Sequence, residues 1–342
     1  KSGAPNFRGI PSLWYRVGGV VMSNPPGALM DDLDGEMPGV AWDLLPMDHY
    51  RSHNWHSFDR IDERAPYAAV HTSLGCPYAC GFCMINAPFG KSAYRMWSPE
   101  TVVAEIDLLA REYGVRNIKF VDEMFVLNKR HVLGICELLK TREYKVNIWA
   151  YARVDTVGED RAFLDTMKTA GINWIWLGIE SASQHVRDGA LKKYGNEDIV
   201  QTVRRIQDAG IYVIGNYIFG LPDDDLGSMQ QTLDLALELN CEYANFYSAM
   251  AYPGSPLYAQ AVKEGRALPE RWSDYSQHGY GCLPLANDHC SSAEILGFRD
   301  RAFHRYFTDL AYLESIERKF GTEVVEHIAR LVSVPLRRRI LK

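Results

Sequence analysis

Apolar, strand-like runs alternate with amphipathic helical stretches between residues 67 and 264, and this alternation constrains the fold more than any other feature. The predicted strands are 68–73, 117–121, 146–151, 174–178, 211–219 and 243–249, and the predicted helices are 98–113, 128–143, 159–170, 197–209 and 226–239. Such alternation predicts a parallel sheet with right-handed crossovers. Six strands are too few for a complete eight-stranded barrel. We therefore expect an α/β fold, a partial (β/α)6 TIM-like barrel.

The segments on either side of the alternation have a different character. Residues 1–66 are rich in Pro, Gly and Asp and predict an extended linker with short turns, with no strand or helix where it begins. Residues 265–342 contain helical patterns at 293–307 and 312–331 and predict a C-terminal helical extension. We expect three parts: the linker, a core barrel over 67–264, and the extension. The chain does not begin with Met, and we expect it to belong to a longer polypeptide.

Composition narrows the classes of partner. The 342 residues include 37 Lys and Arg and 43 Asp and Glu, a net charge of −6, which gives no electrostatic footprint for nucleic acid. No apolar run approaches the roughly 20 residues that a membrane span needs, and no signal peptide is recognisable. Seven cysteines, three of them clustered, favour a reducing cytoplasm over a disulfide framework. We therefore expect a cytoplasmic protein without nucleic-acid or membrane partners.

Three of the cysteines form the run Cys76-x3-Cys80-x2-Cys83, directly after the first predicted strand. Chemistry in barrels of this kind lies at the carboxyl ends of the strands, so we expect the run at that edge. Three thiolates can hold three irons of a [4Fe–4S] cluster and leave the fourth iron open to a small molecule. A structural zinc site is the alternative, but no second pair of ligands follows at the spacing that such sites use.

The other cysteines and a histidine pattern are assigned mainly to packing. Cys136 and Cys241 lie within or at the end of helical patterns and are predicted to be small buried residues. Cys282 or Cys290 remains an alternative fourth ligand for the cluster. The linker contains an H-x3-H-x2-H pattern over residues 49–56. We favour a linker that lies over the mouth of the barrel, and a metal site is the alternative interpretation.

The cysteine run, with an aromatic residue before its last cysteine, resembles that of the radical S-adenosylmethionine (SAM) superfamily. Four further stretches match in order, and they are 120–125, 178–181, 214–222 and 252–258. The resemblance covers about residues 67–264. It implies a [4Fe–4S] cluster whose open iron is chelated by SAM. One electron from the reduced cluster then cleaves SAM to methionine and a 5′-deoxyadenosyl radical.

The resemblance also implies which residues bind the cofactors. The expected metal ligands are Cys76, Cys80 and Cys83, and the expected SAM contacts are Phe82, Asp122, Glu123, Arg153, Glu180, Ser181, Asn216 and Ile218. The acids after the second strand are expected to bind the SAM amino group, the polar residues after the fourth its ribose, and the fifth strand its adenine. Arg153 could pair the SAM carboxylate or form a structural ion pair. Lys192 and Lys193 are expected to be solvated.

The linker resembles a particular subfamily. Residues 10–19, 32–34 and 41–46 are similar to the segment that joins a cobalamin-binding domain to the barrel in cobalamin-dependent radical SAM enzymes. The cobalamin domain would precede residue 1, and the sequence contains no Asp-x-His-x-x-Gly cobalt-ligand motif. In these enzymes one SAM methylates cobalamin. A second SAM yields the radical that abstracts hydrogen from an unactivated carbon, which then takes the methyl group.

We therefore predict a cobalamin-dependent radical SAM methyltransferase. The alternative is a radical SAM cyclase, mutase or oxidoreductase without methyl transfer. A third hypothesis, a non-catalytic iron–sulfur module for electron transfer, would leave the SAM-contact motifs without a purpose. The expected partners are a small-molecule, secondary-metabolite or sugar-type substrate and an electron donor such as a flavodoxin or ferredoxin. The histidines of the linker could also contact substrate or cobalamin.

Overall fold

The computed structural model describes residues 6–342, and its central element is a curled sheet of six parallel strands in the order β10-β9-β8-β7-β6-β3. The strands are β3 (Tyr67–Val70), β6 (Asn117–Phe120), β7 (Asn147–Arg153), β8 (Ile172–Glu180), β9 (Tyr212–Phe219) and β10 (Tyr243–Ser248). Each pairs with its sequence neighbour in parallel register. The predicted α/β partial barrel is confirmed. The first five residues of the predicted linker lie outside the described residues.

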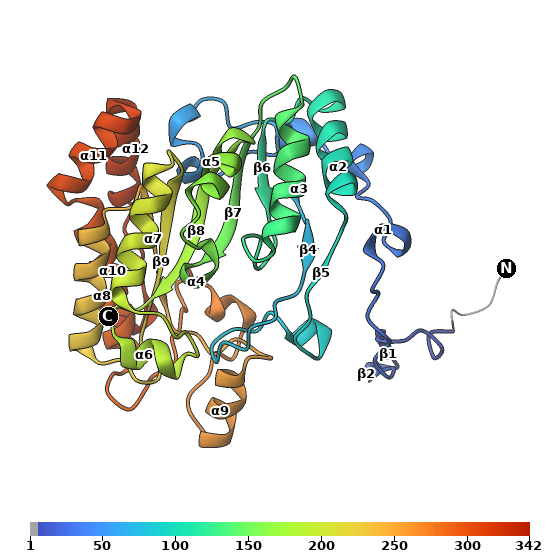
Figure 1. The fold of residues 1–342 in the computed structure, drawn as a ribbon. Helices are drawn as coiled ribbons and strands as arrows, with labels where there is room; N and C mark the ends of the chain where they lie inside the picture. Colours follow the sequence, from blue (N-terminus) through green and yellow to red (C-terminus); the bar gives the residue numbers. More distant parts are fainter. Residues whose placement is uncertain (1–5) are drawn as a thin grey trace. The chain divides into compact units, whose positions relative to one another are not determined.

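Helices connect the strands and cover one face of the sheet (Figure 1). They are α2 (Pro99–Glu112), α3 (Lys129–Lys140), α4 (Val154–Val157), α5 (Arg161–Thr169), α6 (Gln184–Gly189), α7 (Asn196–Asp208) and α8 (Leu226–Leu239), and a further helix, α9 (Pro256–Glu264), follows the last strand. The predicted helix 226–239 matches α8 at both ends, and the other four predicted helices differ from α2, α3, α5 and α7 by at most three residues at either end. Side-chain caps fix the first residue of several helices. Ser98, for example, caps α2 and accepts a hydrogen bond from the amide of Thr101.

The two faces of the sheet differ in exposure. In β8, Ile175 and Leu177 point toward the helices and are buried, whereas Trp176 on the inner face is half-buried. In β9, Asn216 and Ile218 on the inner face are likewise half-buried. Side chains alternate between the two faces of a strand, so this pattern shows an inner face that solvent reaches toward the carboxyl ends of the strands.

The linker enters the amino end of the barrel and not its mouth. Trp55 stacks on Tyr243, the first residue of β10, with ring centroids 5.3 Å apart. His56 stacks on Trp149, near the start of β7, at 4.0 Å. The predicted placement over the mouth is therefore wrong. Aromatic residues at the starts of the strands leave an apolar opening there, and the linker side chains fill it. In the described part of the chain, His49, His53 and His56 do not form a group that could hold a single metal ion.

The start of the described chain contains a hairpin that the sequence did not predict. Strands β1 (Trp14–Val17) and β2 (Val20–Ser23) pair antiparallel around Gly18 and Gly19, whose φ angles are +54° and +86°. These positive φ values suit a two-residue hairpin turn. Both strands are only four residues long and largely exposed, so no buried alternation marks them in the sequence. A short helix, α1 (Leu33–Glu36), follows.

The chain divides into two compact units, one that ends at Pro38 and one that runs from Gly39 to Lys342. Four single-turn 3₁₀ helices follow this boundary, and they are Trp42–Leu44, Met47–His49, Asn54–His56 and Phe58–Arg60. The larger unit contains the whole six-stranded sheet. The division into 1–66, 67–264 and 265–342 stays a prediction.

The C-terminal extension is helical, as predicted, and consists of α10 (Ser292–Phe307), α11 (Leu310–Phe320) and α12 (Thr322–Val332). Helix α10 packs against β10 and α8. The single helical pattern at 312–331 is in fact interrupted at Gly321, which has a φ of +88° and starts α12. Among residues 6–342 no helix is both long and apolar enough to cross a membrane.

Candidate functional site

A single loop carries the three clustered cysteines at the carboxyl edge of the sheet. It follows β3 and is bracketed by a short antiparallel pair, β4 (Ser73–Leu74) and β5 (Arg95–Met96). Gly75 opens the loop with a φ of +84°, and a Cβ at this position would lie 2.4 Å from the carbonyl oxygen of Ala93. Only glycine fits such a close backbone approach. The backbone therefore fixes where the cysteines begin.

The three thiols differ in exposure. Cys76 is buried, while Cys80 and Cys83 are half-buried. The amide of Cys83 donates to the carbonyl of Cys80 at 3.0 Å, which makes a tight turn between them. Burial raises the pKa of the Cys76 and Cys83 thiols. Since iron–sulfur clusters are held by thiolates, iron binding here would release protons. Three thiols on one partly accessible loop fit a [4Fe–4S] cluster by their donor chemistry.

The two acids after β6 tie that strand to the cysteine loop. Asp122 is fully buried and accepts hydrogen bonds from the amide and hydroxyl of Thr72, at 2.7 and 2.5 Å, and from the hydroxyl of Ser73 at 2.6 Å. Glu123 accepts from the amide of Gly75 at 3.1 Å. Burial raises the pKa of Asp122, which these hydrogen bonds oppose. Both acids position the loop, and their contact with SAM stays a prediction.

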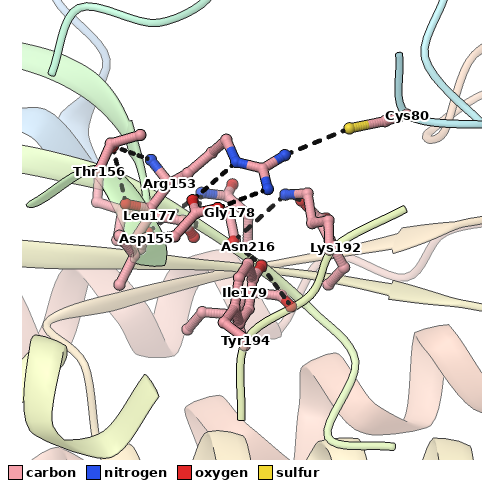
Figure 2. Close-up of polar contacts among 12 residues, drawn as sticks. Cys80, Arg153, Asp155, Thr156, Leu177, Gly178, Ile179, Lys192, Tyr194 and Asn216 are labelled. Carbon is pink, nitrogen blue, oxygen red and sulfur yellow. Dashed lines mark hydrogen bonds and ion pairs between the residues drawn. The ribbon is translucent and has the colours of Figure 1, made fainter. Parts of the chain in front are cut away.

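Arg153, the last residue of β7, reaches the cysteine loop (Figure 2). Its Nη1 donates to Cys80 Sγ at 3.5 Å, while Nε and Nη2 donate to Asp155, each at 2.9 Å. The guanidinium lies 3.8 Å from the ring centroid of Tyr78. Burial alone would lower the pKa of Arg153, but Asp155 and Cys80 raise it, so the group stays cationic. The structural ion pair that we considered is present, and a SAM carboxylate contact stays a prediction.

A buried ion pair lies where β8 ends. Lys192 pairs with Glu180 and also donates to the carbonyl of Gly178 at 3.4 Å. Glu180 has a φ of +67°, at an irregularity in the pairing of β8 with β9. A Cβ on Gly178 would lie 2.8 Å from Glu180 Oε1 and 2.9 Å from Lys192 Nζ, so a larger residue there would displace the ends of the paired side chains. Tyr194 donates to the same carbonyl at 2.7 Å (Figure 2).

The prediction that Lys192 is solvated is wrong, because its side chain is 5% exposed. Burial alone would lower the pKa of Lys192, but Glu180 raises it, so the lysine is charged. Lys193, its neighbour, is exposed as predicted. The pairing residue lies twelve positions away in the sequence, across α6, and no local pattern signals it.

The remaining predicted contacts lie on different sides of the sheet. Ser181 is fully buried and its hydroxyl lies 3.1 Å from that of Thr232 in α8, on the helix side. Asn216 is on the inner face and donates to backbone carbonyls of β8 and β9. Phe82 of the cysteine loop and Ile218 of β9 pack against one buried apolar cluster. The structure thus brings Phe82, Ile218 and Asn216 to one edge and turns Ser181 away.

Sequence reasoning missed three side chains that shape this edge, namely Tyr78, Asp155 and Tyr194. Asp155 follows Arg153 by two residues, which was a usable signal for an ion pair. Tyr78 lies within the cysteine run and could have been recognised there. Tyr194 carried no such signal, because its role depends on how the loop after α6 folds back onto β8.

The four other cysteines are buried. Cys136 and Cys241 are fully buried in the main core, which confirms their predicted packing role. Cys282 packs with Met250 and Leu296, and Cys290 belongs to the main core. All four therefore lie in apolar surroundings.

Comparisons with known proteins agree with this fold. Residues 70–236 match the radical SAM superfamily. The chain is 33% identical over 270 residues to an uncharacterized methyltransferase of Pyrococcus horikoshii. This alignment covers 79% of the chain and 56% of that protein. It is 24% identical over 296 residues to the anaerobic magnesium-protoporphyrin IX monomethyl ester cyclase of Rubrivivax gelatinosus. That alignment covers 86% of the chain and 50% of the cyclase. The chain thus spans about half the length of these relatives.

Two solved structures share the fold. The cobalamin-dependent SAM radical enzyme OxsB aligns with a TM-score of 0.67 at 16% identity, over 95% of this chain and 51% of that one. The radical SAM methyltransferase TsrM of Kitasatospora setae aligns with a TM-score of 0.60 at 20% identity, over 85% and 56%. The six-stranded half-barrel and its cysteine loop define a radical SAM domain. The chain belongs to the radical SAM superfamily, and of these two solved structures OxsB is described as cobalamin-dependent and TsrM has cobalamin bound.

Proposed function

We propose that this chain is the radical SAM part of a cobalamin-dependent enzyme that transfers a methyl group to an unactivated carbon of a small molecule. The observation that carries the proposal is the cysteine loop itself. Three thiols lie on one loop at the carboxyl edge, beside an inner sheet face that solvent reaches. Active sites of barrels with parallel strands lie at this edge.

A [4Fe–4S] cluster bound by Cys76, Cys80 and Cys83 would supply the electron that cleaves SAM. The protein around it holds the start of the loop in place through the amides of Thr72 and Gly75, which donate hydrogen bonds to Asp122 and Glu123. Arg153 donates to Cys80 Sγ, and hydrogen bonds to cluster sulfurs help to set the reduction potential.

The SAM-binding roles of the strand-end residues are part of the proposal. Glu123, Asn216 and Ile218 face the same edge as the cysteine loop and are the side chains that we assign to SAM. Glu180 would act from within its ion pair with Lys192. The remaining predicted contacts, which are Phe82, Asp122, Arg153 and Ser181, would act by holding the loop and the strand ends in place.

Methyl transfer and cobalamin rest on the relatives. One relative is named a methyltransferase, and another, at 26% identity over 263 residues, is the cytidylyl-2-hydroxyethylphosphonate methyltransferase of Streptomyces wedmorensis. Cobalamin would be held by a domain outside this chain. A small-molecule substrate, a flavodoxin or ferredoxin as electron donor and a cytoplasmic location belong to the same proposal.

A second candidate is a radical SAM cyclase that transfers no methyl group. The match to the Rubrivivax cyclase favours it, because that match extends over 86% of this chain. The two candidates share the cysteine loop and SAM cleavage and differ only in the later steps. Product analysis therefore separates them.

The test is anaerobic incubation of the full chain, with its cluster reconstituted, with SAM and dithionite. Release of 5′-deoxyadenosine, measured by liquid chromatography and mass spectrometry, is the expected result. An intact cluster without 5′-deoxyadenosine would contradict both candidates. With cobalamin and the true substrate present, S-adenosylhomocysteine formed alongside 5′-deoxyadenosine supports methyl transfer, and its absence supports the cyclase. A parallel incubation without dithionite is the control.

A further inference from the structure

Lys119 places an ammonium group on the inner face of the sheet. It lies in β6, where its register neighbours are Ala69 of β3 and Trp149 of β7. Its Nζ is 5.1 Å from the ring centroids of both Tyr151 and Trp176. The side chain is half-buried, so a ligand on the inner face can reach it. Lysine in the middle of a barrel strand is unusual unless something there uses its charge.

The ammonium has no countercharge. Among residues 6–342, no carboxylate forms an ion pair with Lys119 and no hydrogen bond from its Nζ is present. Burial lowers the pKa of Lys119, and no acidic group opposes this effect. Burial and the charge of Lys119 lower the pKa of nearby His53, which favours its neutral form, so His53 offers Lys119 no countercharge. A partly desolvated, unpaired cation costs free energy that a bound anion would offset.

Several ring nitrogens of the neighbouring side chains are buried without a hydrogen-bond partner. The indole Nε1 atoms of Trp149 and Trp176 are buried without a hydrogen-bond partner, and so are both ring nitrogens of His56. An indole N–H can only donate. His56 lies against both tryptophans, with ring centroids at 4.0 and 5.2 Å. This part of the inner face therefore carries the Lys119 ammonium and two unpaired indole donors, and neutral His56 adds one donor and one acceptor.

The walls beside Lys119 are flat and apolar. Tyr67 stacks on Trp149 at 5.4 Å with an interplanar angle of 8°, and Tyr151 meets Trp176 edge-on at 4.8 Å. Burial raises the pKa of Tyr67 to about 12, so its hydroxyl stays neutral at physiological pH. Planar, uncharged rings around a cation suit a ligand with a flat apolar body and one acidic group.

We propose that Lys119 binds the carboxylate of a substrate whose flat, unsaturated body lies against Tyr151 and Trp176. The inference rests on the proposed function, because it names the class of small molecule that would occupy the inner face below the SAM site. It assigns to Lys119 a binding role that anchors the substrate by one end.

The probes are 2-naphthoate and its neutral counterpart 2-naphthamide, which share a flat aromatic body and differ in the charge of one group. Binding is measured by anaerobic titration calorimetry on the full chain with its cluster reconstituted and SAM saturating, so that the SAM site is filled. We expect 2-naphthoate to bind about tenfold more tightly than the amide, in line with a charge-assisted hydrogen bond. Lys119→Met should remove this preference and Lys119→Arg should keep most of it.

Lys168→Met is the matched control, because Lys168 also lies over a tyrosine ring, at 5.4 Å from Tyr212, but donates to Asn173. It should leave the preference unchanged. Equal affinities for acid and amide, no saturable binding of 2-naphthoate, or a preference that survives Lys119→Met would each overturn the inference. Release of 5′-deoxyadenosine by the unaltered chain is measured in the same samples. Release without a carboxylate preference overturns this inference alone, and a preference without release overturns the proposed function alone.

Discussion

The two ends of the barrel are built from different interactions. At the amino end, aromatic rings from the linker and the strand starts stack on one another, with Trp55 on Tyr243 and His56 on Trp149. At the carboxyl end, charged side chains are paired, with Lys192 on Glu180 and Arg153 on Asp155. The amino end is a plug of stacked aromatic rings, and the carboxyl end is a polar rim that contains the cysteine loop.

The difference separates stability from chemistry. Burial of the apolar surface of aromatic rings contributes to folding directly and needs no paired charge. A buried ion pair contributes little net stability, but loss of one partner costs several kcal/mol. The ion pairs at the carboxyl end therefore add little net stability to the fold. They hold the side chains around the cysteine loop in fixed positions. Barrels of this kind generally separate stability and activity between these two ends.

The largest expected effect comes from the cysteine loop. Cys80→Ala should abolish cluster binding and all SAM cleavage, because two remaining thiolates cannot hold the cube with one open iron. Iron and sulfide content and 5′-deoxyadenosine release measure the two losses. Cys136→Ala, in the apolar core of α3, is the matched control and should keep both. SAM cleavage that persists in Cys80→Ala would refute the site.

The amino end should carry much of the stability. Trp149→Ala should lower the free energy of unfolding by about 3–5 kcal/mol, because it removes a fully buried ring from the stack. Denaturant titration measures the change, and the iron content of the folded fraction should stay at the level of the unaltered protein. Trp272, 79% exposed, gives the control Trp272→Ala with an effect near zero. If Trp149→Ala changed the free energy of unfolding by less than about 1 kcal/mol, the stacked rings at the amino end would not carry much of the stability.

The carboxyl end should respond to loss of one partner more than to loss of both. Lys192→Met leaves Glu180 buried without its cation and should cost about 3–5 kcal/mol in unfolding free energy. Adding Glu180→Gln to that variant should recover part of the loss. Lys193→Met, at the exposed neighbouring position, is the control. If the double variant loses as much unfolding free energy as the two single variants lose in sum, the two residues do not act as a pair.

The smallest effect is a dependence on pH at the amino end. Burial lowers the pKa of His56 well below its usual range, so the folded protein keeps it neutral while the unfolded chain takes up a proton. Stability that is present above about pH 6.5 is therefore lost as pH falls, by up to about 1.4 kcal/mol per pH unit. His56→Leu should make the free energy of unfolding depend less on pH in this range. Denaturant titrations from pH 7.5 to about 5 measure this dependence.

The exposed His49→Leu variant serves as the control for that profile. Asp224, at the carboxyl end, gives a contribution of opposite sign, since burial raises its pKa to about 6. Its destabilising charge disappears as pH falls from about 6 to 4. Comparing His56→Leu with the unaltered protein at each pH cancels this shared contribution. An unchanged slope below pH 6.5 in His56→Leu would show that His56 is not the group responsible.

Sequence periodicity predicted the sheet and most helices because each β–α unit carries its own apolar pattern, as helix 226–239 shows. The Cys76–Cys83 spacing predicted the loop because it is local in sequence. The misses were of another kind. The Glu180–Lys192 pair, the linker at the amino end and the hairpin around Gly18 depend on how distant or short segments fold together. No local pattern carries that information.

The hydrogen bonds from Thr72 and Ser73 to Asp122 have a consequence for how the protein is assembled in time. They anchor the entrance of the cysteine loop to β6 with protein atoms alone. Small metal-dependent domains collapse into shape only when their ion arrives. Since protein atoms alone hold this entrance, we expect the barrel to fold without iron and to take up its cluster afterwards.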